Sequence, residues 1–596
     1  MSLSVHLLGR PRIEDSSGDG YRFRSRKSWA LLAFLLLSDR PPSRRQLASL
    51  LFSEADDPLR ALRWNLSEVR RSLADGGSLE GDPVVLQLPP DSVVDVATVA
   101  KGAWFDAIDV PDLGSDLLEG IVLQGAPAFD SWLLSEQRRV AAASEAILHE
   151  AALGLMSRGD TRAALGHAMR AAMMSPLDEN NQALLIRLYR LTGDDAAAEQ
   201  QFEACTELFD RELDVTPGPL VRAAMHETRD DNGTGSDPAS VAAIVEAGSA
   251  AVAAGAVEAG VRSLRAAVRL ADGTTVTDLR VSSRLVLAEA LVHSLRGFDE
   301  EGLAALYEAD EMALAGGDHA SVAHARAEVG YVDFLRARYD RAERWLVDAL
   351  AHSDRSPSIA AKAMTYLGSV ASDRADYSRA ASLLEQGIEL ARVVGEPRRE
   401  AFGLSMMGRI SLLRADLDAA ADVLEASIEI AQRDHWLAFL PWPQTLRGEV
   451  QLARDDPEGA EGLLRQAFAR ACQLGDPCWE GMSARGLAMV AHANGEPARA
   501  FQALADARSR CNRLADPYVW LDAYILDAQC TLGLRHGHPD TARWVDTMRH
   551  LSSRTGMREL TVRALLHSAA LGREGDGSAA ALVAADIDNP AVDLLV

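Results

Sequence analysis

The sequence has little cysteine, few aromatic residues and no long apolar run, and each absence excludes a class of protein. Its five cysteines are spread along 596 residues without a CxxC pair, which is typical of free thiols in a reducing cytosol. Aromatic residues make up 5% of the chain and alanine is frequent, a composition that favours close-packed helices over sheets. The apolar run Trp29–Leu37 is too short to cross a bilayer, and the alternating N-terminal residues are typical of a strand rather than a signal peptide. We therefore expect a cytoplasmic protein with no membrane partner.

Lysine is also scarce, and the motifs of several enzyme classes are missing. None of the three lysines (Lys27, Lys101 and Lys362) lies in a GxxxxGK[ST] run, which excludes a P-loop ATPase. No GxGxxG follows a predicted strand, and neither an HExxH motif nor a paired-cysteine zinc signature occurs. We therefore expect no enzyme activity, no cofactor and no metal.

Charge is distributed unevenly along a chain that is too long for one hydrophobic core. The formal net charge of −26 argues against a general nucleic-acid binder. Residues 1–74, however, carry 13 basic and 8 acidic side chains, whereas the remainder carries 48 basic and 79 acidic ones. A positive N-terminal region on a negative body can bind a polyanion locally while the rest repels nonspecific polyanions.

Residues 57–74, DPLRALRWNLSEVRRSLA, form the most informative segment, and their spacing predicts an amphipathic helix. Asp57 is a good N-cap and Pro58 suits the first helical position. Apolar residues at three- and four-residue steps gather on one side, at Leu59, Leu62, Leu66, Val69 and Leu73. The opposite side carries Arg60, Trp64, Ser67 and Arg71, flanked by Arg63 and Arg70. Such a helix suits major-groove reading, although exposed arginines on an ordinary solvated face are common.

The segments around this helix predict a winged helix. Alternating residues at 3–7 indicate a strand, and a basic segment then leads into an apolar helix at 28–38. Ser43-Arg44-Arg45-Gln46 is a capping box that opens a second helix through Phe52. After a break at Gly76–Gly81, two apolar runs around a Pro-Pro-Asp turn predict a β-hairpin at 84–96. In a winged helix the third helix enters the major groove and the hairpin lies on the adjacent backbone or minor groove.

Several runs of residues carry a resemblance to a known family. LLGRPRIE, RSRKSWALLAFLLL, QLASLLF and LRWNLSEVRRSL resemble the DNA-binding domain of the Streptomyces antibiotic regulatory protein family. FDSWLLSEQRR at 129–139 and the segment ending FEACTELFDRELDVTPGPLVRAAMHE at 202–227 resemble that family's bacterial transcriptional activation domain. The resemblance covers about residues 1–228. It implies a regulator that binds direct repeats upstream of promoters and recruits RNA polymerase.

One residue departs from the family pattern. The family usually has arginine after the serine that corresponds to Ser67, and this chain has Glu68. A carboxylate near phosphates is repulsive and lowers affinity. It can also accept a hydrogen bond from a cytosine amino group, which changes specificity instead. The sequence leaves both interpretations open.

The candidate DNA contacts lie on the arginine helix and at the start of the helix before it. We expect Arg60, Arg63, Ser67 and Arg71 to touch bases or phosphates, and Arg70 with Arg44 or Arg45 to anchor the backbone. Trp64 either contacts DNA or packs on the wing, and packing is slightly favoured.

The loop before the arginine helix carries three acidic residues, Glu54, Asp56 and Asp57. The resemblance implies that this loop can touch RNA polymerase. Helix capping and complementarity to the helix dipole explain the same acids equally well.

The second half of the chain is repetitive. Ala342, Ala380, Ala420, Ala460 and Ala500 recur at intervals of 38 to 40 residues, each followed four residues later by leucine and preceded twelve residues earlier by Gly330, Gly368, Gly408, Gly448 or Ala488. A similar interval occurs earlier, within the expected activation domain, where Gly159-Asp160 and Gly193-Asp194 stand 34 residues apart, which matches tetratricopeptide spacing. Small residues at fixed places let helices approach closely, so the pattern predicts a tetratricopeptide-like solenoid. We expect the apolar tail at 578–596 to cap it.

Together these features predict a mainly α chain with four parts: a winged-helix DNA-binding domain of α+β type at 1–105, a helical activation domain at 106–228, a linker at 229–238 and a solenoid at 239–596. The expected function is a sequence-specific transcriptional regulator, an activator by resemblance. Its expected partners are promoter DNA, RNA polymerase, a second copy of the chain, and a signalling protein or small molecule bound by the solenoid. The alternative is a protein-interaction scaffold whose winged helix docks protein and not DNA.

Overall fold

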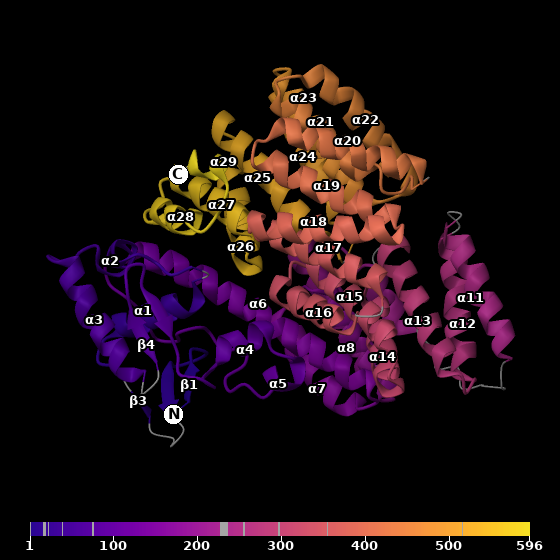
Figure 1. The fold of residues 1–596 in the computed structure, drawn as a ribbon, viewed down its shortest axis with the longest axis horizontal. Coiled ribbons are helices and arrows are strands. Elements are labelled where there is room, and N and C mark those ends of the chain that lie inside the picture. The colour runs from indigo at the N-terminus through magenta and orange to yellow at the C-terminus, as the bar shows by residue number, and fades with distance from the viewer. Residues whose placement is uncertain are drawn as a thin grey trace. The chain divides into compact units, whose positions relative to one another are not determined.

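The computed structural model describes residues 2–15, 20–21, 23–38, 40–73, 77–226, 237–253, 257–295, 299–353, 356–434, 436–514 and 516–595. Helices dominate it, and short strands occur near the N-terminus (Figure 1), which confirms the predicted mainly α fold class. Within the described ranges, no helix combines the length and the apolar character needed to span a membrane. The predicted linker lies outside the described residues except for Asp237 and Pro238.

The chain divides into two compact units, and each of the two boundaries falls inside a helix. The first unit joins Met1–Ile147 to Cys530–Val596, and the second is Leu148–Gln529. The N-terminal part of the first unit contains β1 (Leu3–His6), β2 (Arg12–Asp15), β3 (Gly20–Tyr21), α1 (Arg26–Leu37), α2 (Arg44–Phe52), α3 (Pro58–Ser72), β4 (Ser78–Glu80), β5 (Val85–Gln87), β6 (Val93–Val94), α4 (Asp95–Lys101) and α5 (Trp104–Ala107). Three helices, a small sheet and a hairpin form the winged helix that the sequence predicts.

The wing lies elsewhere in the sequence than predicted. The prediction of a hairpin at 84–96 is therefore wrong. β4 pairs antiparallel with β5, with Leu79 opposite Leu86, and the hairpin therefore spans 78–87. Val93–Val94 instead joins the N-terminal sheet, whose order is β3-β2-β1-β6, with β6 parallel to β1. The reversal takes place at Gly81, whose φ of +90° suits glycine and lets the chain turn before Asp82 and Pro83.

A buried carboxylate joins the sheet to the helix that follows β6. Asp95 Oδ2 accepts hydrogen bonds from the backbone N–H groups of Leu7, at 2.8 Å, and Leu8, at 2.9 Å. Burial raises the pKa of Asp95, and these N–H groups oppose the rise because they favour the charged form. The contact fixes the end of β1 against the start of α4.

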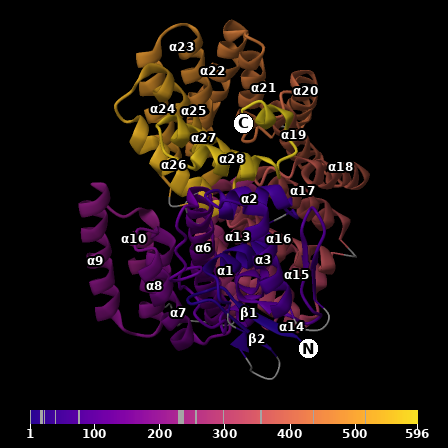
Figure 2. The same cartoon turned by 90° about the vertical axis from the view of Figure 1, so that its left-hand side faces the viewer.

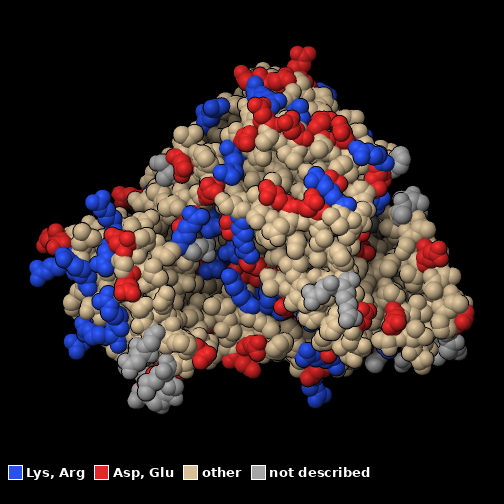
Figure 3. Space-filling view, in the orientation of Figure 1, with Lys and Arg blue, Asp and Glu red and all other residues tan. Residues whose placement is uncertain are grey.

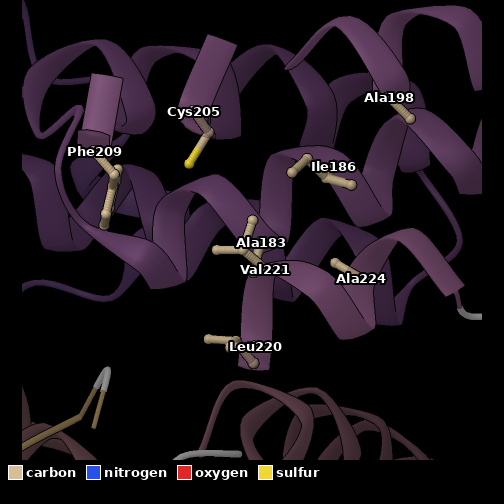
Figure 4. Close-up of a cluster of buried hydrophobic side chains, with 8 residues drawn as sticks. All are labelled: Ala183, Ile186, Ala198, Cys205, Phe209, Leu220, Val221 and Ala224. Carbon is tan, nitrogen blue, oxygen red and sulfur yellow. The ribbon is translucent and has the colours of Figure 1, made fainter. Parts of the chain in front are cut away.

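Helical pairs follow the winged helix: α6 (Pro127–Ser157), α7 (Thr161–Met174), α8 (Glu179–Leu191), α9 (Asp195–Leu213) and α10 (Pro219–His226). Each predicted Gly-Asp pair precedes a helix, because Asp160 caps α7 and Asp194 caps α9 through their side chains. α8 packs against α9 and α10 (Figure 2). Their buried core (Figure 4) consists of Ala183, Ile186, Ala198, Cys205, Phe209, Leu220, Val221 and Ala224.

The predicted solenoid is present in the second unit, where consecutive helices pack in sequence order. Its helices are α11 (Pro238–Ala253), α12 (Val257–Asp272), α13 (Thr277–Ala290) with the π-helical turn η1 (Leu291–Leu295), α14 (Asp299–Gly316), α15 (His319–Leu335), α16 (Tyr339–His352), α17 (Pro357–Asp373), α18 (Tyr377–Val394), α19 (Pro397–Leu413), α20 (Leu417–Arg433), α21 (Pro441–Ala453), α22 (Pro457–Leu474), α23 (Pro477–Ala493), α24 (Pro497–Cys511) and α25 (Val519–His536), which crosses into the first unit.

The repeated residues meet as the spacing predicts. The five alanines and the leucines four residues after them are completely buried. A Cβ at Gly368 would lie 2.6 Å from the Cγ of Leu384, and one at Gly408 would lie 2.5 Å from the Cγ of Leu424. Each glycine therefore leaves room for the leucine of its own repeat, which lets the two helices approach closely.

Buried ion pairs hold the activation helices to the solenoid within the second unit. Arg336, which follows α15, pairs with Asp516 (Nε to Oδ1, 2.7 Å) and with Glu300 of α14 (Nη2 to Oε2, 3.0 Å). Asn180 of α8 donates from Nδ2 to Asp516 Oδ1 at 2.8 Å. His149 of α6 lies with its Nε2 3.1 Å from Glu300 Oε1. One set of buried side chains thus connects two activation helices to two distant parts of the solenoid.

The C-terminal helices return to the first unit. They are α26 (Thr541–Thr555), α27 (Arg558–Ala570), α28 (Asp576–Ala584) and α29 (Pro590–Asp593). Asp576 is buried and accepts from Ser131 Oγ of α6 at 2.9 Å and from Arg549 of α26 at 3.0 Å. Trp132 of α6 packs edge-on against Phe34 of α1, with ring centroids 4.9 Å apart. The start of α6 therefore lies between the winged helix and the C-terminal helices.

Candidate nucleic-acid interface

Helix α3 is built as the sequence predicts. Asp57 Oδ1 accepts from the backbone N–H of Arg60 at 2.9 Å, and Pro58 occupies the first turn. Leu62, Leu66 and Val69 are buried, and α3 packs against α1 and α2. Leu59 is the exception, because 46% of it remains exposed and it does not belong to the core face. The hydrophobic side holds the helix in place and leaves the other side open to solvent.

The open side of α3 carries the predicted contacts. Arg60, Arg63 and Arg71 are exposed, Ser67 is half-buried, and Trp64 is 49% exposed on the same side. Figure 3 shows basic side chains gathered over α2 and α3. The structure thus brings five of the predicted DNA-contact residues onto one accessible strip of guanidinium groups, a hydroxyl and an indole.

Two arginines predicted to anchor the DNA backbone also bond to the wing. Arg70 donates from Nε and Nη2 to the carbonyl oxygen of Leu79 in β4, at 3.0 and 2.7 Å. Arg44 donates from Nε to the carbonyl oxygen of Gly81 at 3.0 Å, and its backbone N–H donates to Asp82 Oδ1. Both arginines therefore fix the wing against α2 and α3. Arg45 is exposed and remains available to a phosphate.

Glu68 lies on the inner side of α3 and does not face the open strip. Only 3% of it is exposed, and its carboxylate accepts from the backbone N–H of Arg24 at 2.8 Å and from Ser28 Oγ at 2.5 Å. Ser28 Oγ also lies 2.8 Å from Asn65 Oδ1, a second buried side chain. Neither interpretation that the sequence left open fits this placement. The residue fixes the start of α1 against α3.

The acidic loop before α3 separates into three environments. Asp57 is engaged as the N-cap. Glu54 lies against Gly125, where a Cβ would meet Glu54 Oε2 at 1.9 Å, and Ser53 Oγ donates to the carbonyl oxygen of Gly125. Asp56 is exposed and bonds to nothing in the described part of the chain. It is the loop acid with no structural task there.

Sequence reasoning missed the wing turn and the wing anchors. The signal for the turn was present, because Gly81-Asp82-Pro83 is a strong reversal motif. No local pattern indicates that Arg44 and Arg70 bond to backbone carbonyls 37 and 9 residues away. Such contacts depend on the fold and leave no spacing signal in the sequence.

In the described residues, Glu289, His324 and Glu328 form the one group whose ligand atoms lie close enough to hold a metal ion, within 4.8 Å of one another. The ammonium group of Lys362 already sits among them, 2.9 Å from Glu289 Oε1 and 3.3 Å from His324 Nε2. A lysine that occupies the centre supplies the positive charge the carboxylates need, so the group is best explained as a salt-bridge network.

Comparisons with known proteins identify one domain and several folds of similar type. Residues 94–229 match the family model of the bacterial transcriptional activator domain. This match confirms the predicted activation domain and the resemblance that rests on it. No curated protein sequence matches the chain.

Three solved structures are similar to it. Mycobacterium tuberculosis EmbR in complex with a low-affinity phosphopeptide is 18% identical over 37% of this chain and 64% of that one, with a TM-score of 0.30. A Rap protein complexed with competence and sporulation factor is 13% identical over 60% and 100%, with a TM-score of 0.41. A signal transduction ATPase with a tetratricopeptide repeat sensor, from Pyrococcus horikoshii, is 14% identical over 85% and 65%, with a TM-score of 0.33. The chain thus spans less than two thirds of EmbR, and scores this low support no functional argument.

Proposed function

We propose that this chain, which carries a bacterial transcriptional activator domain, is a sequence-specific DNA-binding regulator that activates transcription. In this proposal α3 enters the major groove and the wing lies on the neighbouring backbone. The observation that carries it is the open strip of α3, where Arg60, Trp64 and Arg71 are exposed while leucines hold the helix from behind. Binding to direct repeats and action in the cytoplasm follow from the family resemblance and belong to the proposal.

The test is a titration of the full chain against its own upstream DNA, by anisotropy at several salt concentrations. Binding weakens with salt because phosphate contacts release counterions. Arg60→Ala and Arg71→Ala each weaken binding by about 1–3 kcal/mol if they read bases. Arg10→Ala is the matched control, because Arg10 is exposed in the loop between β1 and β2 and not on α3. Salt-insensitive binding, or none to any genomic fragment, contradicts the proposal and favours the protein-docking scaffold.

RNA polymerase recruitment is the second part of the proposal, and Asp56 is its best candidate in the loop. Asp57 caps α3 and Glu54 lies against Gly125, whereas Asp56 is exposed and unbonded among the described residues. Asp56→Ala should lower transcription in a reconstituted assay and leave DNA affinity unchanged. Asp57→Ala would instead loosen the first turn of α3 and lower DNA affinity as well. Full transcription by Asp56→Ala contradicts this assignment.

The solenoid is proposed to bind a signalling protein or a small molecule, since stacked repeats present a long surface to partners. A second copy of the chain is the remaining proposed partner. Analytical ultracentrifugation with and without promoter DNA tests the latter, and a single copy of the chain per species in both conditions contradicts it.

A further inference from the structure

Helices α6 and α26 of the first unit hold more basic than acidic side chains close together. Arg138 of α6 donates from Nη1 to Ser553 Oγ of α26 at 3.3 Å. His550 and Arg554 stand one turn apart on α26, on either side of Ser553, and both are exposed. The hydrogen bond of Arg138 goes to a hydroxyl and not to a carboxylate, although the charge of Asp546 lies close enough to attract it. Figure 3 shows basic side chains over α26 and the middle of α6.

The carboxylates in this region are already engaged. Asp576 Oδ1 lies 3.0 Å from Arg549 Nη2, and Asp546 is paired with Arg573. Each of the two acids therefore has an arginine of its own. Asp546 also attracts Arg138, so two carboxylates are left to balance four arginines, namely Arg138, Arg549, Arg554 and Arg573. A positive charge that is left over in a chain of net charge −26 is unusual.

The titration behaviour agrees with this imbalance. Burial and the nearby charge of Arg549 lower the pKa of Arg138 more than the charge of Asp546 raises it. Burial, together with the charges of Arg138 and Arg554, lowers the pKa of His550. Like charges that are held together disfavour each other's protonated forms, and an anion placed among them removes the penalty. Forked guanidinium donors beside a histidine are suited to a phosphate group.

We propose that Arg138, His550 and Arg554 form a binding site for a phosphate group, with the buried Ser553 hydroxyl orienting Arg138. The phosphate belongs either to the DNA backbone beyond the bases that α3 reads or to a small phosphorylated molecule. The DNA source rests on the proposed function, whereas the small-molecule source does not. The site connects α6, which packs on α1 through Trp132, to the C-terminal helices. Its occupancy would therefore stabilise the contact between the DNA-binding domain and the end of the solenoid.

The first experiment uses inorganic phosphate with the full chain. In calorimetry of the full chain, phosphate at tenfold over its dissociation constant raises the midpoint of the transition that contains the first unit by about 2 °C or more, beyond sodium chloride of equal ionic strength. Arg554→Ala and Arg138→Gln abolish this shift. Arg543→Ala is the matched control, because Arg543 lies on the same helix and pairs with Asp540, and it retains the shift.

The second experiment distinguishes the two sources. Duplexes that contain only the recognition sites are compared with duplexes extended at both ends. If the site binds a DNA backbone phosphate, Arg554→Ala weakens binding of the extended duplex several-fold and does not affect the short duplex. It also lowers the slope of log affinity against log salt concentration for the extended duplex by about one. If phosphate raises the transition midpoint but Arg554→Ala affects the extended and the short duplex equally, the source is a small molecule.

A chain that binds DNA while Arg554→Ala and Arg138→Gln change neither readout overturns the site and leaves the proposed function intact. A chain that binds no DNA refutes the proposed function, and the phosphate experiment still decides the site. Loss of the shift in Arg543→Ala as well shows general charge screening and also overturns the site.

Discussion

Replacing Glu68 tests whether the residue that departs from the family pattern supports the DNA-binding domain from inside. The buried carboxylate accepts from the Arg24 N–H and the Ser28 hydroxyl. In Glu68→Ala the hydroxyl retains Asn65 as an acceptor, but the Arg24 N–H loses its partner. A hydrogen bond to a charged group contributes about 1.5–3 kcal/mol, and an unpaired N–H adds to the loss. We expect Glu68→Ala to destabilise the contact between α1 and α3 by about 2–4 kcal/mol.

Hydrogen exchange measured by mass spectrometry on the full chain is the suitable assay, because a chain of several domains does not unfold in one step. A loss of 2–4 kcal/mol raises the local opening constant by roughly 30- to 1,000-fold. Peptides that contain residues 24–28 and 65–69 should exchange faster, and those of α18 should not change. Glu68→Gln keeps an acceptor oxygen for the Arg24 N–H, so its effect should be smaller, about 1 kcal/mol.

The reasoning also predicts DNA binding. Because the side chain at position 68 points inward, Glu68→Arg buries an unpaired cation and weakens DNA binding through misfolding of the domain. Tighter DNA binding by Glu68→Arg, with unchanged exchange at residues 24–28, would refute the buried placement and show that position 68 faces the duplex.

Three further predictions concern packing, pH and capping. Gly408→Ala places a methyl group 2.5 Å from Leu424 and should cost about 1–3 kcal/mol, seen as faster hydrogen exchange of α19 and α20. Gly462→Ala on the open side of α22 should leave exchange of α22 unchanged or slower, and equal effects would contradict the packing. Burial lowers the pKa of His149, but the charge of Glu300 outweighs burial and raises that pKa above 6.5. The stability gained from the charged His149 is therefore complete below pH 6.5 and is lost as pH rises through the raised pKa. Burial raises the pKa of Glu300, but His149 and Arg336 lower it to about 2. The stability that the Glu300 carboxylate contributes is therefore present above pH 4.5 and is lost as pH falls toward 2. Hydrogen exchange of α8 should become faster at both pH limits, and His149→Gln should remove the limit at high pH. Ser43→Ala removes the capping box of α2 and should cost about 0.5–2 kcal/mol, seen as faster exchange of the Gln46 amide, while Ser49→Ala on the exposed side of α2 should not.

Local signals in the sequence predicted the elements that depend on neighbouring residues. The capping box at Ser43, the N-cap at Asp57 and the Gly–Leu spacing of the repeats are all present, because each acts over a few turns of helix or within one helix pair. Leu59 was misplaced since the periodicity of a first helical turn does not show whether anything covers it.

Contacts between distant parts of the chain could not be predicted in this way. Glu68 carries no mark that distinguishes a buried carboxylate from one that faces DNA, and the choice depends on Arg24 and Ser28, some forty residues earlier. The same holds for the bond between Ser131 and Asp576, which are 445 residues apart. A pairing of this kind leaves no periodic pattern, and only the folded chain reveals it.

The bond between Arg336 and Asp516 restricts how this gene can change. Solenoid genes commonly gain or lose whole repeats, since each repeat contacts only its neighbours. Here one buried pair closes a stretch of 180 residues, and a duplication or deletion inside it would move one partner away and leave the other as a lone buried charge. Repeat number should therefore be constant between these two positions in descendants of this gene, while variation is tolerated outside them.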